Sequence, residues 1–275
     1  MKQVIKIFIR IALFASVWSV THAQDFSGGF KAGYNINYLE GSTIVDADGN
    51  EVESLKNGNG FHVGAILNYR LSEFYGLRSH VLFTQRGGSI QFDAEESYLI
   101  LRNPAGDDPK REIATGRKQV SLNLSNSYIE IPLMVYGKYK NFELVVGPSL
   151  GLLISSTASG SIDFDGEWRR EPIELRSVID HQYYKDDARE GEDPILINTG
   201  LEQVQYPATH LAYFEHDEKD GPLYKVLNFG FNAEFNFFFN KGLFVGVGYY
   251  HGFNDVTNQE MDADWLDLDE DDALI

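Results

Sequence analysis

The residues from 227 to 251 constrain the fold more than any other stretch of the chain. Every second residue from 227 to 239 is apolar, and the residues between them are Asn, Gly or Glu, with Phe238 as the exception. A helix repeats its faces every 3.6 residues, whereas the side chains of a strand alternate between two faces. After a turn at 240–242 the alternation resumes from 243 to 249. The pattern predicts a long β-hairpin with one apolar and one polar face.

The same alternation predicts five more strands upstream, which gives seven readable strands. Their approximate ranges are 30–39, 61–70, 75–86, 120–138 and 142–154.

The connections between the strands alternate in length. Short turns lie near residues 72, 140 and 240, and long polar excursions cover 40–59, 91–118 and 157–224. An outer-membrane barrel has this rhythm because its periplasmic turns are short and its extracellular loops are long. We therefore expect an all-β fold: an antiparallel, up-and-down transmembrane barrel of about eight strands in the outer membrane.

The two faces of the predicted wall have different chemistry. A narrow barrel of this size has an interior just wide enough for side chains to fill. Buried charges persist there only when they are paired or wet, so we expect a plugged polar core rather than a diffusion pore. The alternative places some of these side chains in periplasmic solvent. The residues assigned to the lumen are Lys31, Arg78, Arg86, Glu130 and Glu234, with Arg70 and Glu143 in the same inward set. The residues assigned to lipid are Phe229, Phe231, Phe235, Val245 and Val247.

Composition excludes several functions. The formal net charge of −18 makes nucleic acid an improbable partner, because a phosphate-binding surface needs clustered Lys and Arg. The absence of cysteine removes disulfides, thiol catalysis and cysteine-ligated metals. The excursion at 157–224 holds 16 acidic and 6 basic residues. We interpret the acidic excursions as a solvated outer surface and expect no cofactor or metal.

The first 23 residues have the pattern of a secretory signal peptide. A basic segment with Lys2, Lys6 and Arg10 precedes an apolar stretch, and small residues at Thr21 and Ala23 predict cleavage after Ala23. The apolar stretch is shorter than the about 20 residues that span a bilayer. The predicted organisation is a signal peptide at 1–23, a barrel domain at 24–255 and an acidic tail or truncated loop at 256–275.

Six short segments of the predicted strands share a recognisable pattern. They are GFKAGYNINY (29–38), GFHVG (60–64), LFTQRGG (82–88), YIEIPL (128–133), VGPSLG (146–151) and GVGYYHGFND (246–255). Together they resemble the PorT-like outer-membrane β-barrel family of Bacteroidetes. The resemblance covers about residues 26–255 and implies an eight-stranded barrel; the founding member is linked to type IX secretion and protease maturation. No catalytic motif comes with it.

The C-terminal tail departs from the family pattern, which closes with an eighth strand. The residues after Phe253 include many Asp and Glu and no Lys or Arg, and such a segment cannot face lipid because charges are costly there. Either the chain is truncated before its last strand, which we favour, or an upstream segment closes the barrel.

Three functions remain open at this point. The first is a non-enzymatic barrel whose extracellular loops contact envelope or secretion proteins. The second is a barrel enzyme acting on lipid or peptide, which predicts a Ser–His–Asp set at the outer rim; His80 or His251 with Ser79 or Asp255 would be the candidates. The third is a soluble, lipocalin-like calyx with its apolar residues pointing inward.

Overall fold

A computed structural model describes residues 25–46, 48–104, 110–198, 202–216 and 218–258. The ten strands of these residues belong to one sheet. Within the described part of the chain, no helix is long and apolar enough to cross a membrane. The strands are β1 (Phe26–Asn37), β2 (Glu53–Arg70), β3 (Tyr75–Asn103), β4 (Lys110–Tyr139), β5 (Phe142–Trp168), β6 (Glu171–Gln182), β7 (Gly191–Asn198), β8 (Gln203–His210), β9 (Leu227–Phe238) and β10 (Phe244–Gly252).

Seven of these strands form the wall of the barrel. Antiparallel pairs join them in the order β1-β2-β3-β4-β5-β9-β10. The predicted hairpin at 227–251 corresponds to β9 and β10, in which Phe237 pairs with Val245. The short turns between β2 and β3, β4 and β5, and β9 and β10 also lie where the sequence places them. The prediction of an antiparallel, mostly up-and-down barrel fold is confirmed.

The two outer strands of this wall run in the same direction. Because the seven strands of the wall are joined by antiparallel pairing throughout, the first strand, β1, is parallel to the last, β10. Among the described residues, β1 pairs only with β2, and β10 pairs only with β9. The expected signal peptide and the acidic tail after residue 258 lie outside the described residues, so the prediction of a missing last strand stays a prediction.

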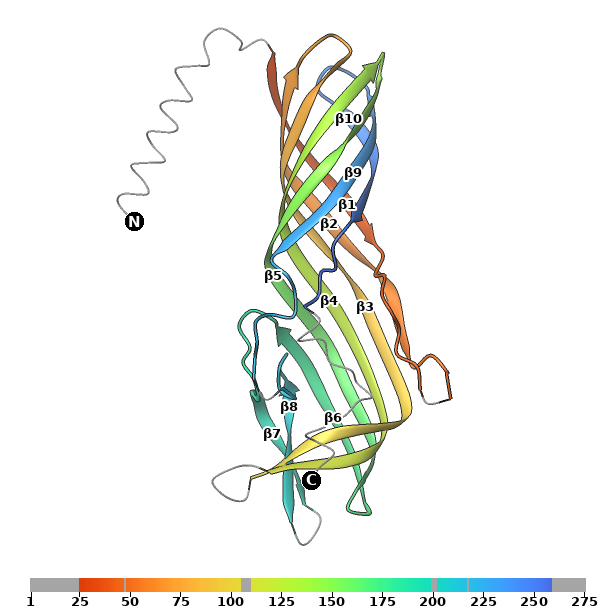
Figure 1. Cartoon of the computed structure of the whole chain (residues 1–275), viewed down its shortest axis with the longest axis vertical. Coiled ribbons are helices and arrows are strands. Elements are labelled where there is room, and N and C mark those ends of the chain that lie inside the picture. Colours follow the sequence, from red (N-terminus) through yellow and green to blue (C-terminus); the bar gives the residue numbers. More distant parts are fainter. Residues whose placement is uncertain (1–24, 47, 105–109, 199–201, 217, 259–275) are drawn as a thin grey trace, which may run out of the picture.

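The prediction that 91–118 and 157–224 are loops is wrong for most of their length. β3, β4 and β5 continue through these segments to lengths of 29, 30 and 27 residues, and β6, β7 and β8 follow (Figure 1). The acidic residues of these segments lie mainly at outward positions. The inward positions of the same strands carry a row of apolar residues. On β6 that row is Ile173, Leu175 and Ile179.

The extended strands form a second part of the structure beyond the barrel, which we call the head. It comprises β3 from residue 88, β4 up to residue 124, β5 from residue 156, β6 to β8, and residues 211–216 after β8. A parallel contact joins β6 to β8 and an antiparallel contact joins β8 to β3 at Arg102 and Gln205. These contacts close the ring β3-β4-β5-β6-β8 around an apolar interior. Its fully buried side chains include Leu99, Leu101, Phe164, Trp168, Val204 and Tyr206.

The inward row of β4 shows how the head and the barrel differ. It reads Val120, Leu122 and Leu124 in the head and continues as Asn126 and Tyr128 at the entrance of the barrel. Inward residues of a strand lie on one face because side chains alternate. One strand therefore lines an apolar chamber in the head and the beginning of a polar lumen below it.

We expect Leu101→Ala to destabilise the head. Removing a fully buried Leu side chain costs about 2–5 kcal/mol because the lost burial is joined by a cavity. Limited proteolysis of the folded protein in detergent measures the effect as new cleavage within residues 88–124 and 156–216. The matched control is Leu133→Ala, whose side chain is 64% exposed on the barrel wall. If the two variants are cut alike, the head has no core of its own.

Candidate functional site

Arg78 and Glu143 form the most deeply buried ion pair of the barrel interior. Arg78 Nη1 donates to Glu143 Oε1 at 2.6 Å, and Nη2 donates to Oε2 at 3.0 Å. The remaining groups are also engaged: Arg78 Nε donates to Asn68 Oδ1 at 2.6 Å, and Asn236 donates to Glu143 at 3.2 Å. A two-pronged Arg–carboxylate pair with further hydrogen bonds is the geometry in which buried charges are tolerated. The pair links β3 to β5 across the lumen.

A second pair connects the first strand of the wall to the hairpin. Lys31 of β1 donates to Glu234 of β9, although these strands are not neighbours in the sheet. His80 is fully buried, with its Nδ1 3.9 Å from Glu234 Oε1. This contact spans the interior and joins the first strand of the wall, β1, to the last hairpin, β9–β10.

A third pair lies nearer to the head. Arg86 donates to Glu130, and Glu130 also accepts hydrogen bonds from Ser149 at 2.8 Å and Asn232 at 3.0 Å. The guanidinium of Arg86 lies over the ring of Tyr250, 3.6 Å from its centroid. Aromatic faces attract cations in this way.

The structure places all five predicted lumen residues inside the wall. Lys31, Arg78, Arg86, Glu130 and Glu234 account for five of the six charges in these pairs, and Glu143 is the sixth. The three cations and three carboxylates of these pairs cancel one another, and each of the six charges has an opposite partner within the barrel interior.

Arg70 does not belong to this set, contrary to the prediction. It lies at the end of β2 with a side chain 55% exposed and pairs with Asp25 at 3.5 Å. Its position on an inward-facing row was read correctly from the alternation, but the row reaches solvent where the strand ends.

The five residues assigned to lipid are exposed on the strands of the barrel wall. The exposed fractions are 50% for Phe229, 38% for Phe231, 48% for Phe235, 57% for Val245 and 75% for Val247. Apolar side chains of β1 to β5 share this exposure, including Phe30, Leu67, Leu133 and Leu144. A continuous apolar band of this kind is costly in water and stable against hydrocarbon.

A polar cluster inside the head was missed by the sequence reading. His181 at the end of β6 lies 3.2 Å from His210 at the end of β8, measured between Nε2 and Nδ1. His210 Nε2 lies 3.8 Å from Glu215 Oε1, and Lys118 of β4 lies 3.9 Å from the same oxygen. No local sequence pattern marked this cluster, because all of its members, Lys118 included, come from the segments 91–118 and 157–224, which the sequence pattern predicts to be loops.

Burial and the neighbouring charged groups shift the pKa of Glu215 in this cluster in opposite directions. Burial raises the pKa of the Glu215 carboxyl. The nearby Lys118, His210 and His216 lower this pKa by a larger amount, so that it is about 2. Burial, followed by the neighbouring His210, lowers the pKa of His181 to about 3. Burial also lowers the pKa of the Lys118 ammonium. The cluster at neutral pH therefore contains an ionised Glu215 and a neutral His181.

The candidate enzyme residues lie on different faces of the wall. His80 is buried in the lumen, whereas His251 is exposed on β10, where its ring stacks on Tyr249 with centroids 6.4 Å apart. Within the described ranges, no three His, Asp or Glu side chains are placed to hold a metal ion. His80 and His251 therefore do not belong to one common site.

A family model described as an outer membrane protein β-barrel domain matches residues 22–258. The chain belongs to this family. Membership places the protein in the outer membrane. That the exposed apolar band of the wall faces lipid stays a prediction. Comparisons with curated proteins and with solved structures give no match.

We expect Glu143→Gln to cost about 3–5 kcal/mol of unfolding free energy, because it leaves Arg78 buried without its counter-charge. Denaturation by urea in detergent micelles measures this loss. The double variant Arg78→Gln, Glu143→Gln removes both charges and should lose less than the single variant. Arg117→Gln is the surface control, since the Arg117–Asp93 pair is exposed and such pairs contribute about 0–1 kcal/mol. Equal losses in Glu143→Gln and Arg117→Gln would contradict the assignment.

The head should lose stability as the pH falls below 6.5. The unfolded chain takes up a proton on His181 near its ordinary pKa of 6.5, whereas the folded head excludes that proton until about pH 3. The unfolding free energy should fall by about 1.4 kcal/mol per pH unit in this range. Glu215 adds to the loss only below about pH 4.5. Urea titrations at several pH values measure the slope, and His181→Gln should reduce it between pH 6.5 and 4.5; an unchanged slope would contradict the proposed buried neutral His181.

Proposed function

We propose that this protein is a non-enzymatic outer-membrane barrel that holds the β-structured head outside the cell as a docking surface for envelope or secretion proteins. The observation that carries the proposal is the continuity of β3, β4 and β5 from the barrel into the head. Because the same backbone ladders run through both parts, the barrel fixes the orientation of the head. Orienting a surface is what a docking scaffold needs.

The surface of the head supports a protein partner. Its outward positions carry more acidic than basic side chains, and apolar Val178 and Leu196 are each more than half exposed among them. Acidic surface around isolated apolar residues suits a partner with basic groups at its rim. The exposed acidic residues of β5 to β7 and their connections are Asp165, Glu167, Glu171, Glu174, Asp180, Asp187, Glu190, Glu192 and Asp193.

The resemblance to the PorT-like family favours secretion proteins among the possible partners. The quoted segments lie on the strands of the wall, from 29–38 on β1 to 246–255 on β10. They therefore support a shared barrel more than a shared head. A partner from the type IX secretion route is our specific proposal, and the head would determine which protein docks.

Site-specific photo-crosslinking tests the docking role. A photoreactive residue at Asp180 or Glu192 of the head should give adducts with another envelope protein in intact cells, whereas one at Glu73, in the turn at the opposite end of the barrel, should not. Glu192→Lys with Asp193→Lys should reduce the Asp180 adduct, because it reverses charge on the docking face. Adducts that form equally at Glu73, or no adducts from the head, would refute the proposal.

A further inference from the structure

The lumen continues into the head as one cavity of about 1790 Å³. Its lining changes at the junction between the two parts. The barrel side contributes Arg86, Thr84 and Tyr250, and the head side contributes Leu122 and Leu124. A concave space with an apolar wall and a few convergent polar groups is the usual form of a small-molecule site.

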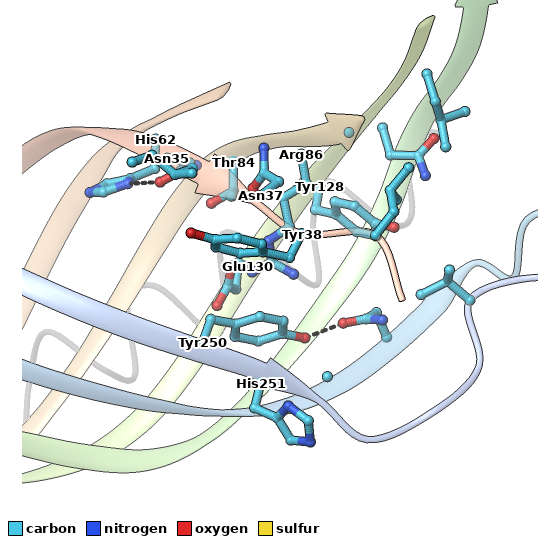
Figure 2. Close-up of a pocket in the computed structure, with 18 of the residues that line it drawn as sticks. Asn35, Asn37, Tyr38, His62, Thr84, Arg86, Tyr128, Glu130, Tyr250 and His251 are labelled. Atoms are coloured by element: carbon cyan, nitrogen blue, oxygen red, sulfur yellow. Dashed lines mark hydrogen bonds and ion pairs between the residues drawn. The ribbon is translucent and has the colours of Figure 1, made fainter. Parts of the chain in front are cut away.

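The polar side of this junction pocket has hydrogen-bonding capacity that the protein does not use. Thr84 is only 4% exposed, and its hydroxyl has no hydrogen-bond partner among the described residues. The side-chain nitrogen of Asn37 is also buried, and no partner for it occurs within the same residues. Leaving such groups unsatisfied is unfavourable, because they lose contact with water and gain no hydrogen-bond partner. Both residues line the cavity with Arg86 (Figure 2).

The backbone of β2 is shaped to let Asn37 reach this position. A Cβ atom at Gly60 would lie 3.2 Å from Asn37 Nδ2 and 2.1 Å from the carbonyl oxygen of Gln85. The close approach of the Gln85 carbonyl oxygen requires glycine at position 60, and the same glycine leaves the Asn37 amide room beside β2. The amide, the Thr84 hydroxyl and Arg86 thus belong to one wall of the pocket.

Arg86 supplies further hydrogen-bond donors at this wall, and its charge is paired with Glu130. Its partner Glu130 is engaged by Ser149 and Asn232 as well, so the carboxylate is well satisfied. The guanidinium has five N–H donors in a fixed fork, lines the cavity, and is held against the Tyr250 ring. Tyr250 is itself fixed by a hydrogen bond to Asn228. A fixed guanidinium beside a free amide N–H and a hydroxyl forms a donor-rich site for acceptor oxygens.

The side of the pocket nearer the head is apolar. Leu122 and Leu124 project into the cavity from β4, and Ile90 lines it from β3. Leu39, which follows β1, packs so closely on Gly88 that a Cβ atom there would lie 2.4 Å from Leu39 Cδ1. This wall offers contact area to an apolar body but no hydrogen bonds.

We propose that the junction pocket binds a small amphipathic carboxylate. The carboxylate accepts hydrogen bonds from Arg86, Thr84 and Asn37, and the apolar body lies against Leu122 and Leu124. The ligand thereby satisfies two buried groups that the protein leaves open. This site is separate from the outer surface of the head and does not depend on the docking role.

Octanoate is a suitable probe because it has one carboxylate and a short apolar chain. Ligand-observed NMR with the protein in lipid nanodiscs measures binding, and empty nanodiscs correct for partition into lipid. Octanamide, which has the same chain without the charge, is the comparison ligand. We expect saturable octanoate binding and at least tenfold weaker octanamide binding; equal binding of both, or no saturable binding of octanoate, would overturn the proposal.

Variants of the pocket test the assigned wall. Thr84→Val removes the hydroxyl at nearly constant shape and should weaken octanoate binding about tenfold, whereas Thr84→Ser keeps the hydroxyl and should bind as the parent does. Leu124→Trp fills the apolar side and should abolish binding, and Leu133→Trp on the outer wall should not. A folded band that shifts on heating shows that each variant is intact. Parent-like binding by both Thr84→Val and Leu124→Trp would place the ligand elsewhere and overturn the assignment.

Discussion

The backbone ladder between β3 and β4 is the interaction on which the rest of the structure depends. It begins at the pair Tyr75–Gly137, ends at Asn103–Lys110, and shifts register once, between Ala94 and Ser97. In hydrocarbon every backbone polar group needs a partner within the protein, and this ladder supplies such partners through the barrel. Because it does not stop at the end of the apolar band, it also carries the head, and one pair of strands fixes the position of both parts.

In the barrel and in the head, side chains alternate between the two faces of each strand, but the apolar residues lie on opposite faces. In the barrel the apolar residues face outward, so the inward face must be polar and its charges must cancel, as Arg78 with Glu143 and Lys31 with Glu234 do. In the head the outward face is solvated, so the apolar residues turn inward and pack around Trp168. The change of solvent along the strands therefore inverts which face is apolar.

This inversion makes the junction chemically mixed. The polar interior of the barrel meets the apolar interior of the head between Leu124 and Asn126 on β4. Groups at such a boundary, such as the Thr84 hydroxyl, cannot be satisfied fully by either side. The outer surface of the head, which we propose as a docking surface, and the junction pocket, which we propose as a ligand site, are thus separate from each other.

The sequence by itself determined the strands of the wall and the residues on each face, because alternation is a local property that the pleated backbone enforces. Phe229 outside and Arg78 inside followed from it. Only the tertiary structure decided that the acidic segments fold into a head. Their inward rows are short, and they become a core only when β8 reaches β3 at Arg102. The His181–His210–Glu215 cluster likewise needed that closure, since contacts between distant segments leave no local pattern in the chain.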